Sequence, residues 1–279
     1  MLDLSRVPPT VLSPVLRVVR AAVAQADGLT PDDIMLVGAC CRDILHSALG
    51  HIFPNTATSD LDLALGLSSW QAFESLASAF APIGPTGIRF RIAEVVVDLL
   101  PFGGIEEPPG QVNPPSRGES LSVWAFEEIF AASQALPLAP GITIRLPSVA
   151  GYAAAKIGAW LDRSTWHEVK DAPDLALALF WYFHAPEVSD RLYDTQPGQD
   201  ILIRYGADLD LAAAFLLGVD VAATIGSVRQ GELLRRWPGD AALLIRELTV
   251  RGGPAWPRDP QRRRAILEAL THGLSDGPR

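Results

Sequence analysis

The spacing of hydrophobic residues changes near the middle of the chain. Up to Pro147, short apolar or alternating runs that predict strands are interspersed with helical spacings. We expect a helix starting at Ser13-Pro14, then strands at 34–37, 59–66, 88–92 and 94–100, and helices at 39–49 and 68–80. After Pro147, apolar residues recur every three to four positions, which predicts helices at 148–163, 168–184, 207–217, 228–236 and 261–272. The pattern therefore predicts an α/β domain over 1–147 and a helical domain over 148–279.

Composition narrows the class of protein. With 48% hydrophobic and 20% charged residues, the 279-residue chain can form a substantial core and is not disordered. The net charge of −9 argues against a surface that binds nucleic acid everywhere, although a local basic patch remains possible. No uncharged apolar run approaches the roughly 18 residues of a membrane span. The amino terminus lacks the pattern of a signal peptide. We therefore expect no membrane span and no secretion signal.

The two cysteines indicate the cellular compartment in which the protein works. Cys40 and Cys41 are adjacent, so they cannot link distant parts of the chain and do not have the spacing of a zinc site. A reducing, cytoplasmic location fits this cysteine usage best.

Two aspartates stand in one predicted strand, where aspartate is disfavoured. Asp60 and Asp62 are two residues apart, and a strand with a period of two places both carboxylates on one face. Carboxylate oxygens held in this way suit Mg²⁺ or Mn²⁺, and such pairs serve two-metal phosphoryl transfer. The alternative interpretation is a polar, solvated strand face.

A third aspartate interrupts an otherwise apolar strand. Asp98 follows Val95, Val96 and Val97, and a buried carboxylate is costly without a charge partner or a metal ion. Glu94 is four residues earlier and could share such a site. The alternative is an internal ion pair between Asp98 and Arg89 or Arg91 of the neighbouring predicted strand.

A turn between a strand and a helix precedes the aspartates. Gly38 and Ala39 follow the apolar strand 34–37 and open a helix, whose first free N–H groups favour phosphate. Such turns are common. This one is of interest as a phosphate site because it lies about twenty residues before Asp60.

These segments together carry a resemblance. The runs VGACCRD (37–43), TSDLDL (58–63) and VDLLPFGG (97–104) resemble the nucleotidyltransferase superfamily, with its strand-glycine turn, Asp-x-Asp strand and third acidic residue. The closer likeness is to the AbiEii/AbiGii-type nucleotidyltransferase toxins. In that family the helical half carries a lysine and then a Lys-Asp-x-x-Asp-Leu run. Here Lys156 and the run from Lys170 to Leu175 correspond, and they hold both lysines of the chain.

The resemblance implies a fold and an activity. We expect a nucleotidyltransferase-type mixed sheet with flanking helices, followed by a helical domain that completes the active-site cleft. It would move an NMP from an NTP to an acceptor hydroxyl. Asp60, Asp62 and Asp98 would hold Mg²⁺ or Mn²⁺, with Asp98 also acting as the base. The toxin family implies a tRNA 3′ end as acceptor and a cognate antitoxin protein as partner.

Further residues complete the expected nucleotide site. Gly38 and Ala39 would contact phosphate through the backbone, since Ala39 replaces the usual serine or glycine of the superfamily. Lys156 would place a positive charge beside the triphosphate, unless it is only a surface lysine. Pro173 predicts a helix start, which makes Asp171 a cap and Asp174 a first-turn acid near the nucleotide.

The acceptor stays open at this stage. Arginines gather in the last part of the chain and could form a track for RNA: Arg229, Arg235, Arg236, Arg246, Arg251, Arg258, Arg262, Arg263 and Arg264. Solvated helix faces paired with nearby acids are the alternative. Two other functions also remain: nucleotidyl transfer to a small molecule such as an aminoglycoside or to a protein, and a binding module without turnover.

Overall fold

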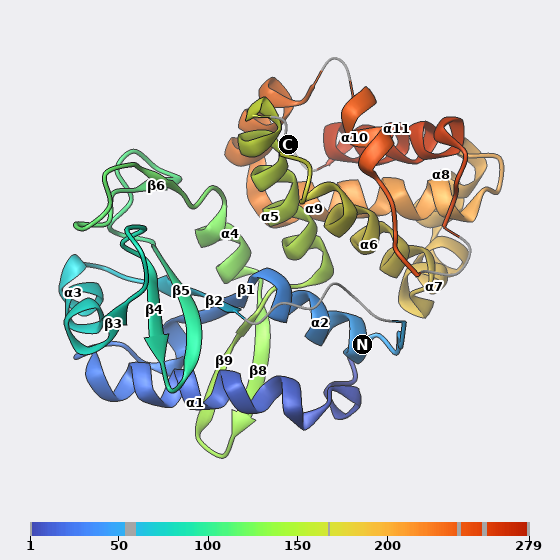
Figure 1. The fold of residues 1–279 in the computed structure, drawn as a ribbon. Coiled ribbons are helices and arrows are strands. Elements are labelled where there is room, and N and C mark those ends of the chain that lie inside the picture. Colours follow the sequence, from blue (N-terminus) through green and yellow to red (C-terminus); the bar gives the residue numbers. More distant parts are fainter. Residues whose placement is uncertain (1, 54–59, 167, 239–240, 253–255, 278–279) are drawn as a thin grey trace. The chain divides into compact units, whose positions relative to one another are not determined.

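The computed structural model describes residues 2–53, 60–166, 168–238, 241–252 and 256–277. The chain divides after Ser148 into a sheet-containing unit and a helical unit, with Phe53 packed in the helical unit against Phe180. Sequence analysis predicted this division between residues 147 and 148. The fold is α/β with a mixed sheet, flanking helices and a C-terminal helical region, which confirms the expected class (Figure 1).

The sheet unit runs from the amino terminus to Ser148. Its helices are α1 (Pro9–Gln25), α2 (Gly38–Ala48), α3 (Trp70–Ala79) and α4 (Phe126–Ala131). Its strands are β1 (Ile34–Val37), β2 (Asp60–Gly66), β3 (Ala81–Pro82), β4 (Arg89–Ile92), β5 (Val95–Phe102), β6 (Gln111–Val112), β7 (Leu121–Ser122), β8 (Gln134–Ala139) and β9 (Ile142–Leu146).

Seven of these strands form one mixed sheet in the order β3-β4-β5-β2-β1-β9-β8. The central strands β5 and β2 are parallel, and each has an antiparallel neighbour on its other side, β4 and β1 respectively. Helix α1 packs against β4 and β8, and α2 packs against β1 and β2 (Figure 1). Leu61, Leu63 and Leu65 of β2 are buried, so one face of the central strand belongs to the core.

A two-residue turn joins β4 to β5. Ala93 and Glu94 both have positive φ values, 48° and 63°, while Ile92 pairs with Val95 on either side of the turn. Positive φ at both central positions matches the mirror-image turns that suit the twist of a hairpin. Glu94 therefore belongs to the turn and is exposed, which corrects the prediction that it begins a strand.

Several predicted boundaries are corrected. Helix α1 begins at Pro9, upstream of Ser13, and includes Pro14. Ser59 of the predicted strand 59–66 and Thr58 of the motif lie outside the described residues. The hairpin of β8 and β9 was not predicted. Pro137 lies within β8, and proline is tolerated there because β8 is an edge strand of the sheet.

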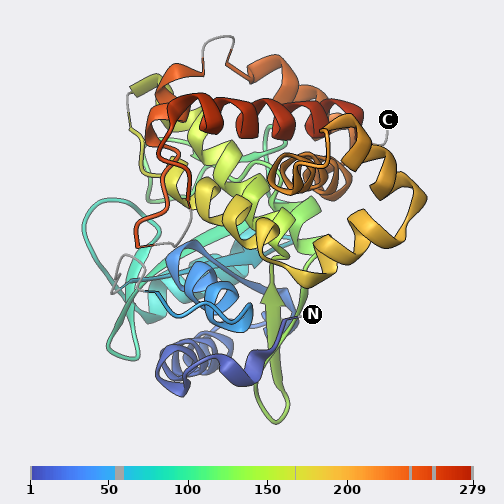
Figure 2. The ribbon, with the colours of Figure 1, turned by 90° about the vertical axis from the view of Figure 1, so that its right-hand side faces the viewer.

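The helical unit contains α5 (Val149–Arg163), α6 (Ala172–Phe183), α7 (Pro186–Asp194), α8 (Gln196–Arg204), α9 (Leu209–Arg236), α10 (Ala242–Glu247) and α11 (Pro260–Asp276). Sequence analysis missed α7, α8 and α10, and it divided α9 into two helices. The backbone of Gly226 is in fact non-helical, so α9 consists of two helical stretches across a kink. Helix α11 packs along α9 (Figure 2).

Helix α9 is long and apolar enough to cross a membrane by length and composition alone. However, 56% of its most apolar 18-residue window is buried inside the protein. Burial of this kind is typical of a core helix in a soluble protein.

Candidate active site

The three aspartates share one face of the sheet. In the parallel pair of β2 and β5, Asp62 is the direct partner of Asp98, and Asp60 lies two residues before Asp62. Directly paired residues of neighbouring strands point to the same side, as do residues two apart in one strand. The fold therefore gathers Asp60, Asp62 and Asp98 at the centre of the sheet.

Arg89 bridges two of these carboxylates. It lies opposite Asp98 in the antiparallel pair of β4 and β5. Its Nη1 donates to Asp98 Oδ2 at 3.0 Å, and its Nη2 donates to Asp60 Oδ2 at 2.9 Å. Of the two arginines considered as partners for Asp98, the structure thus selects Arg89, while Arg91 is exposed.

Asp98 is more enclosed than Asp60, whose side chain is 33% exposed. Its side chain is 18% exposed, and its Oδ1 atom is buried without a hydrogen-bond partner among the described residues. Burial raises the pKa of Asp98 above its ordinary value, the Arg89 charge opposes that rise, and the nearby Asp60 adds to it. A carboxylate with a raised pKa is a better proton acceptor than an ordinary one.

Gly38 places backbone directly against Asp62. Gly38 is the first residue of α2 and has φ +66°, and Val37 before it pairs with Asp62 across β1 and β2. A Cβ atom at position 38 would lie 1.9 Å from Asp62 Oδ2, so a larger residue cannot fit without displacing the carboxylate. Ala39 follows in the first turn of α2, which has no side-chain cap.

Cys40, the residue after Ala39, is affected by the charge of Asp62 as well. Burial, reinforced by Asp43 and Asp62, raises the pKa of the Cys40 thiol to about 12. This rise favours the protonated thiol, which is the less nucleophilic form.

The donor chemistry of the site fits a hard divalent cation. Among the residues that the structure describes, no three His, Cys, Asp or Glu side chains are grouped closely enough to hold a metal ion. Carboxylate oxygens are nevertheless the ligands that Mg²⁺ and Mn²⁺ prefer, and Asp98 Oδ1 is a buried acceptor that has no hydrogen-bond partner in the described part of the chain. In the described arrangement, the cation next to Asp60 and Asp98 is the Arg89 guanidinium.

Lys156 and Asp174 belong to the helical unit, where they contact each other. Lys156 Nζ lies 2.5 Å from Asp174 Oδ2 and 3.7 Å from Asp171 Oδ1, and its side chain is 16% exposed. Asp171 is buried and also accepts from Arg163. Pro173 stands in the first turn of α6, with Asp171 at the cap position and Asp174 in that turn, as expected, but Asp171 makes no capping bond. Lys156 is a partly buried, paired lysine, which excludes the surface-lysine interpretation.

The arginines at the end of the chain differ in their surroundings. Arg229 and Arg263 are buried, and Arg236, Arg246 and Arg262 pair with Asp162, Glu247 and Asp208 respectively. Arg262 also pairs with Asp210. The arginines that are exposed and have no ion pair among the described residues are Arg235, Arg251, Arg258 and Arg264. Of the nine, only these four are available to a polyanion without breaking an existing contact.

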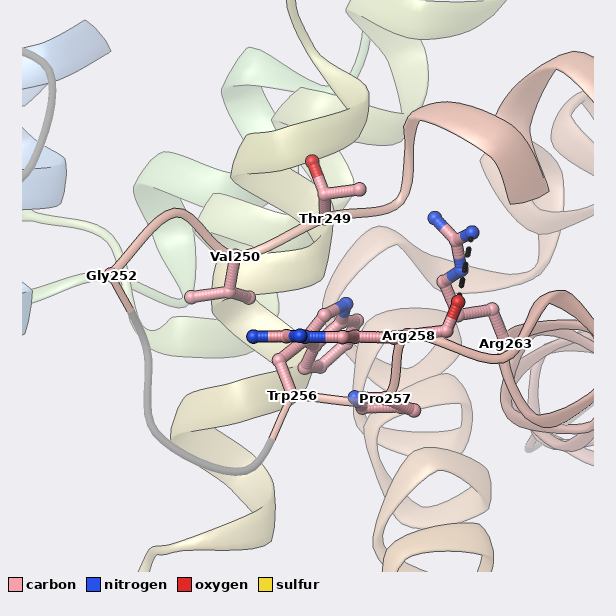
Figure 3. A pocket seen from close by; sticks show the side chains of 7 residues that line it. All are labelled: Thr249, Val250, Gly252, Trp256, Pro257, Arg258 and Arg263. Carbon is pink, nitrogen blue, oxygen red and sulfur yellow. Dashed lines mark hydrogen bonds between the residues drawn. The ribbon is translucent and has the colours of Figure 1, made fainter.

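One cavity of the helical unit is lined by two of these nine arginines, Arg258 and Arg263. It has a volume of about 500 Å³ and is lined by Thr249, Val250, Gly252, Trp256, Pro257, Arg258 and Arg263 (Figure 3). Trp256 is held by stacking on Phe183 and by donating from Nε1 to the Leu248 carbonyl at 2.9 Å. The Arg263 guanidinium donates to the carbonyls of Arg246 and Arg258. Of the two lining arginines, Arg258 is the one whose guanidinium has no hydrogen bond or ion pair among the described residues.

Sequence reasoning weighed Arg89 only as a possible structural partner of Asp98. Its second bond, to Asp60, was missed because it depends on the pairing of three strands. The available signal was the position of Arg89 and Asp98 nine residues apart on either side of a short turn.

Searches against protein-family models and against curated proteins find no match for this chain.

Proposed function

We propose that this protein is a cytoplasmic, metal-dependent nucleotidyltransferase that moves an NMP from an NTP to the hydroxyl of an acceptor. The observation that carries the proposal is the pairing of Asp62 with Asp98 across parallel strands, with Asp60 on the same face. The backbone of Gly38 adjoins this acidic cluster at the start of a helix, where phosphate binds favourably.

Each residue of the proposed site has a stated role in nucleotidyl transfer. The acceptor oxygen forms a bond to the α-phosphorus as the bond from that phosphorus to the pyrophosphate oxygen breaks. Asp98 accepts the hydroxyl proton, a role that its raised pKa supports. Asp60, Asp62 and Asp98 provide the carboxylates for Mg²⁺ or Mn²⁺, which when bound neutralises charge on the triphosphate. The N–H groups at Gly38 and Ala39 donate to phosphate oxygens.

Lys156 and Asp174 pair with each other within the helical unit. Their proposed role toward the nucleotide, with Lys156 as a point charge for the triphosphate, follows from the resemblance to nucleotidyltransferase toxins.

The favoured acceptor is an RNA 3′ end, following the resemblance to nucleotidyltransferase toxins, in which case an antitoxin protein is a partner. A small-molecule or protein hydroxyl is the second candidate. The observation in its favour is that most of the nine clustered arginines are already buried or paired, in a chain of net charge −9.

The test is transfer of label from α-³²P-labelled NTPs in the presence of Mg²⁺. Total tRNA, a protein mixture and a panel of aminoglycosides serve as separate acceptor pools. We expect wild-type protein to label one pool, and Asp60→Ala and Asp62→Ala to label none while keeping their helical circular dichroism. Near-wild-type transfer by either folded variant contradicts the proposal. The labelled pool decides between the two acceptor classes.

A further inference from the structure

We propose that Arg89 is the resident counter-cation of the acidic site, holding Asp60 and Asp98 until a divalent cation displaces it and then binding the triphosphate. This inference rests on the proposed function. It assigns to Arg89 two successive partners, carboxylates before the metal ion binds and phosphate oxygens afterwards.

The geometry of the guanidinium carries the inference. Arg89 spreads its two terminal nitrogens over two different carboxylates, using only the Oδ2 atom of each, at 3.0 Å and 2.9 Å. The second oxygen of Asp98, Oδ1, is buried and has no hydrogen-bond partner among the described residues. The ion pair thus leaves a buried acceptor unsatisfied, which is costly for an arrangement that serves stability alone.

Other arginines of the chain show what a stability pair looks like here. Arg191 binds both oxygens of Asp220, at 2.6 Å and 2.9 Å, and Arg262 binds both oxygens of Asp208, at 2.5 Å and 2.8 Å, in addition to Oδ2 of Asp210 at 3.0 Å. Such two-point pairing gives both oxygens of one carboxylate a charged partner. Arg89 instead binds a single oxygen of each of its two carboxylates and makes a two-point pair with neither.

Arg89 is also free to leave. Its side chain is 32% exposed, compared with 18% for Asp98. A divalent cation on the same carboxylates would repel the guanidinium at short range. A displaced guanidinium remains charged and offers a planar set of donors that match phosphate oxygens. The same residue would therefore weaken metal binding and strengthen binding of the metal–nucleotide complex.

Arg91 provides a matched control. It lies on β4 two residues from Arg89, so it points to the same side of the sheet, and it is exposed. Within the described part of the chain it has no ion pair with the aspartates, since Asp60 and Asp98 pair with Arg89. Arg91→Met removes the same charge from the same strand without removing the bridge.

The experiment measures Mn²⁺ binding to the full chain by electron paramagnetic resonance, first alone and then with a non-reactive α,β-methylene NTP. For Arg89→Met we expect Mn²⁺ alone to bind roughly three- to tenfold more tightly than to wild type. The Mn²⁺–nucleotide complex should bind more weakly by a similar factor. Arg91→Met should change neither affinity by more than about twofold.

A second variant and a spectroscopic measurement cover the case in which Arg89→Met does not fold. Arg89→Lys keeps the charge but replaces the two terminal nitrogens, which reach separate carboxylates, with a single ammonium group, so Mn²⁺ should again bind more tightly, with less loss of nucleotide affinity. In wild-type protein, the Arg89 guanidinium NMR signal, identified by its absence in Arg89→Lys, should shift when Mg²⁺ is added.

The outcomes separate this inference from the proposed function. Unchanged or weaker Mn²⁺ binding in folded Arg89 variants, or an unmoved guanidinium signal, overturns the counter-cation role and leaves the nucleotidyltransferase proposal standing. Failure of wild-type protein to bind Mn²⁺, or equal binding by Asp62→Ala, overturns the metal site itself and this inference with it.

Discussion

The backbone of Gly38 lies so close to Asp62 that a Cβ atom at position 38 would stand 1.9 Å from the carboxylate oxygen Oδ2. Gly38 therefore determines where the Asp62 carboxylate can lie. Gly38 begins the helix that is proposed to bind phosphate, and Asp62 is a proposed metal ligand. The positions of these two residues therefore depend on each other sterically.

Gly38→Ala should lower both stability and nucleotidyl transfer. The substitution places alanine at φ +66°, which costs about 1–2 kcal/mol, and it also drives a methyl group into Asp62. Gly28→Ala is the control, because Gly28 has φ +83° with nothing within 4 Å of its added Cβ. Urea unfolding should show a larger loss of stability for Gly38→Ala. Equal losses would mean that Asp62 moves aside at no cost.

Asp98→Asn should reduce transfer by roughly 10²–10⁴-fold, the usual contribution of a general base, while NTP binding changes less. Burial is the largest cause of the raised pKa of Asp98 and outweighs the attraction of Arg89. A neutral isostere should therefore leave the melting temperature equal or higher. A marked fall in melting temperature with transfer intact would show that Asp98 serves the Arg89 pair alone.

Lys156→Ala should weaken NTP binding and also destabilise the helical unit. The substitution leaves Asp174 without its 2.5 Å partner, and removing one member of a partly buried pair costs about 1–3 kcal/mol. Lys170→Ala is the control, because Lys170 is exposed and lies 3.9 Å from Glu168. Calorimetric NTP titration alongside thermal melting distinguishes the roles. Unchanged NTP affinity in folded Lys156→Ala assigns the lysine to structure only.

Salt dependence tests the RNA acceptor. If RNA binds the helical unit, the exposed arginines without an ion pair among the described residues should carry the contact, and three of these four, Arg251, Arg258 and Arg264, follow α10. Replacing all three by glutamine should flatten the dependence of tRNA labelling on salt, because each phosphate contact releases a counterion. NTP affinity should stay the same. Arg262→Gln should instead lower stability, since Arg262 holds Asp208 and Asp210. Labelling that does not depend on salt would favour the small-molecule or protein acceptor.

Acid stability should depend on Asp208. Hydrogen bonds from Arg262 are the largest cause of the lowered pKa of Asp208, so this carboxylate stabilises the fold above its unfolded pKa of about 3.9. That contribution is lost as the pH falls through the lower folded pKa. Asp208→Asn keeps the helix cap on Leu211 but loses the charge, and should flatten the acid limb of the stability curve. Asp259→Asn, at the cap of α11, is the control for a change at a cap alone.

The sequence predicted strands wherever an apolar or alternating run was uninterrupted, as at 34–37 and 59–66. It missed β8 because Pro137 and alanines give that segment little strand preference, and its pairing with β9 determines its structure. The helix at the amino terminus was placed too late because Ser13-Pro14 has the pattern of a helix start. Proline inside a helix is unfavourable, but burial of Val15, Val18 and Val19 on α1 outweighs that cost.

For the candidate site, a period of two was enough to place Asp60 and Asp62 on one face, and an acid among valines was enough to single out Asp98. The Arg89 bridge could not be predicted, because it requires the register of three strands. The contact of Lys156 with Asp174 joins α5 to α6, and helix packing of that kind leaves no periodic trace in the chain.

The length of the turn at Ala93 and Glu94 affects the geometry of the acidic site. Arg89 and Asp98 are equidistant from this turn, so they face each other in the register that the two-residue turn sets. One inserted residue would shift the pairing and bring Phe90, now buried in the opposite face, towards the position of the guanidinium. The acidic site therefore depends on the length of a connection that holds none of its ligands, and insertions there should be as damaging as loss of an aspartate.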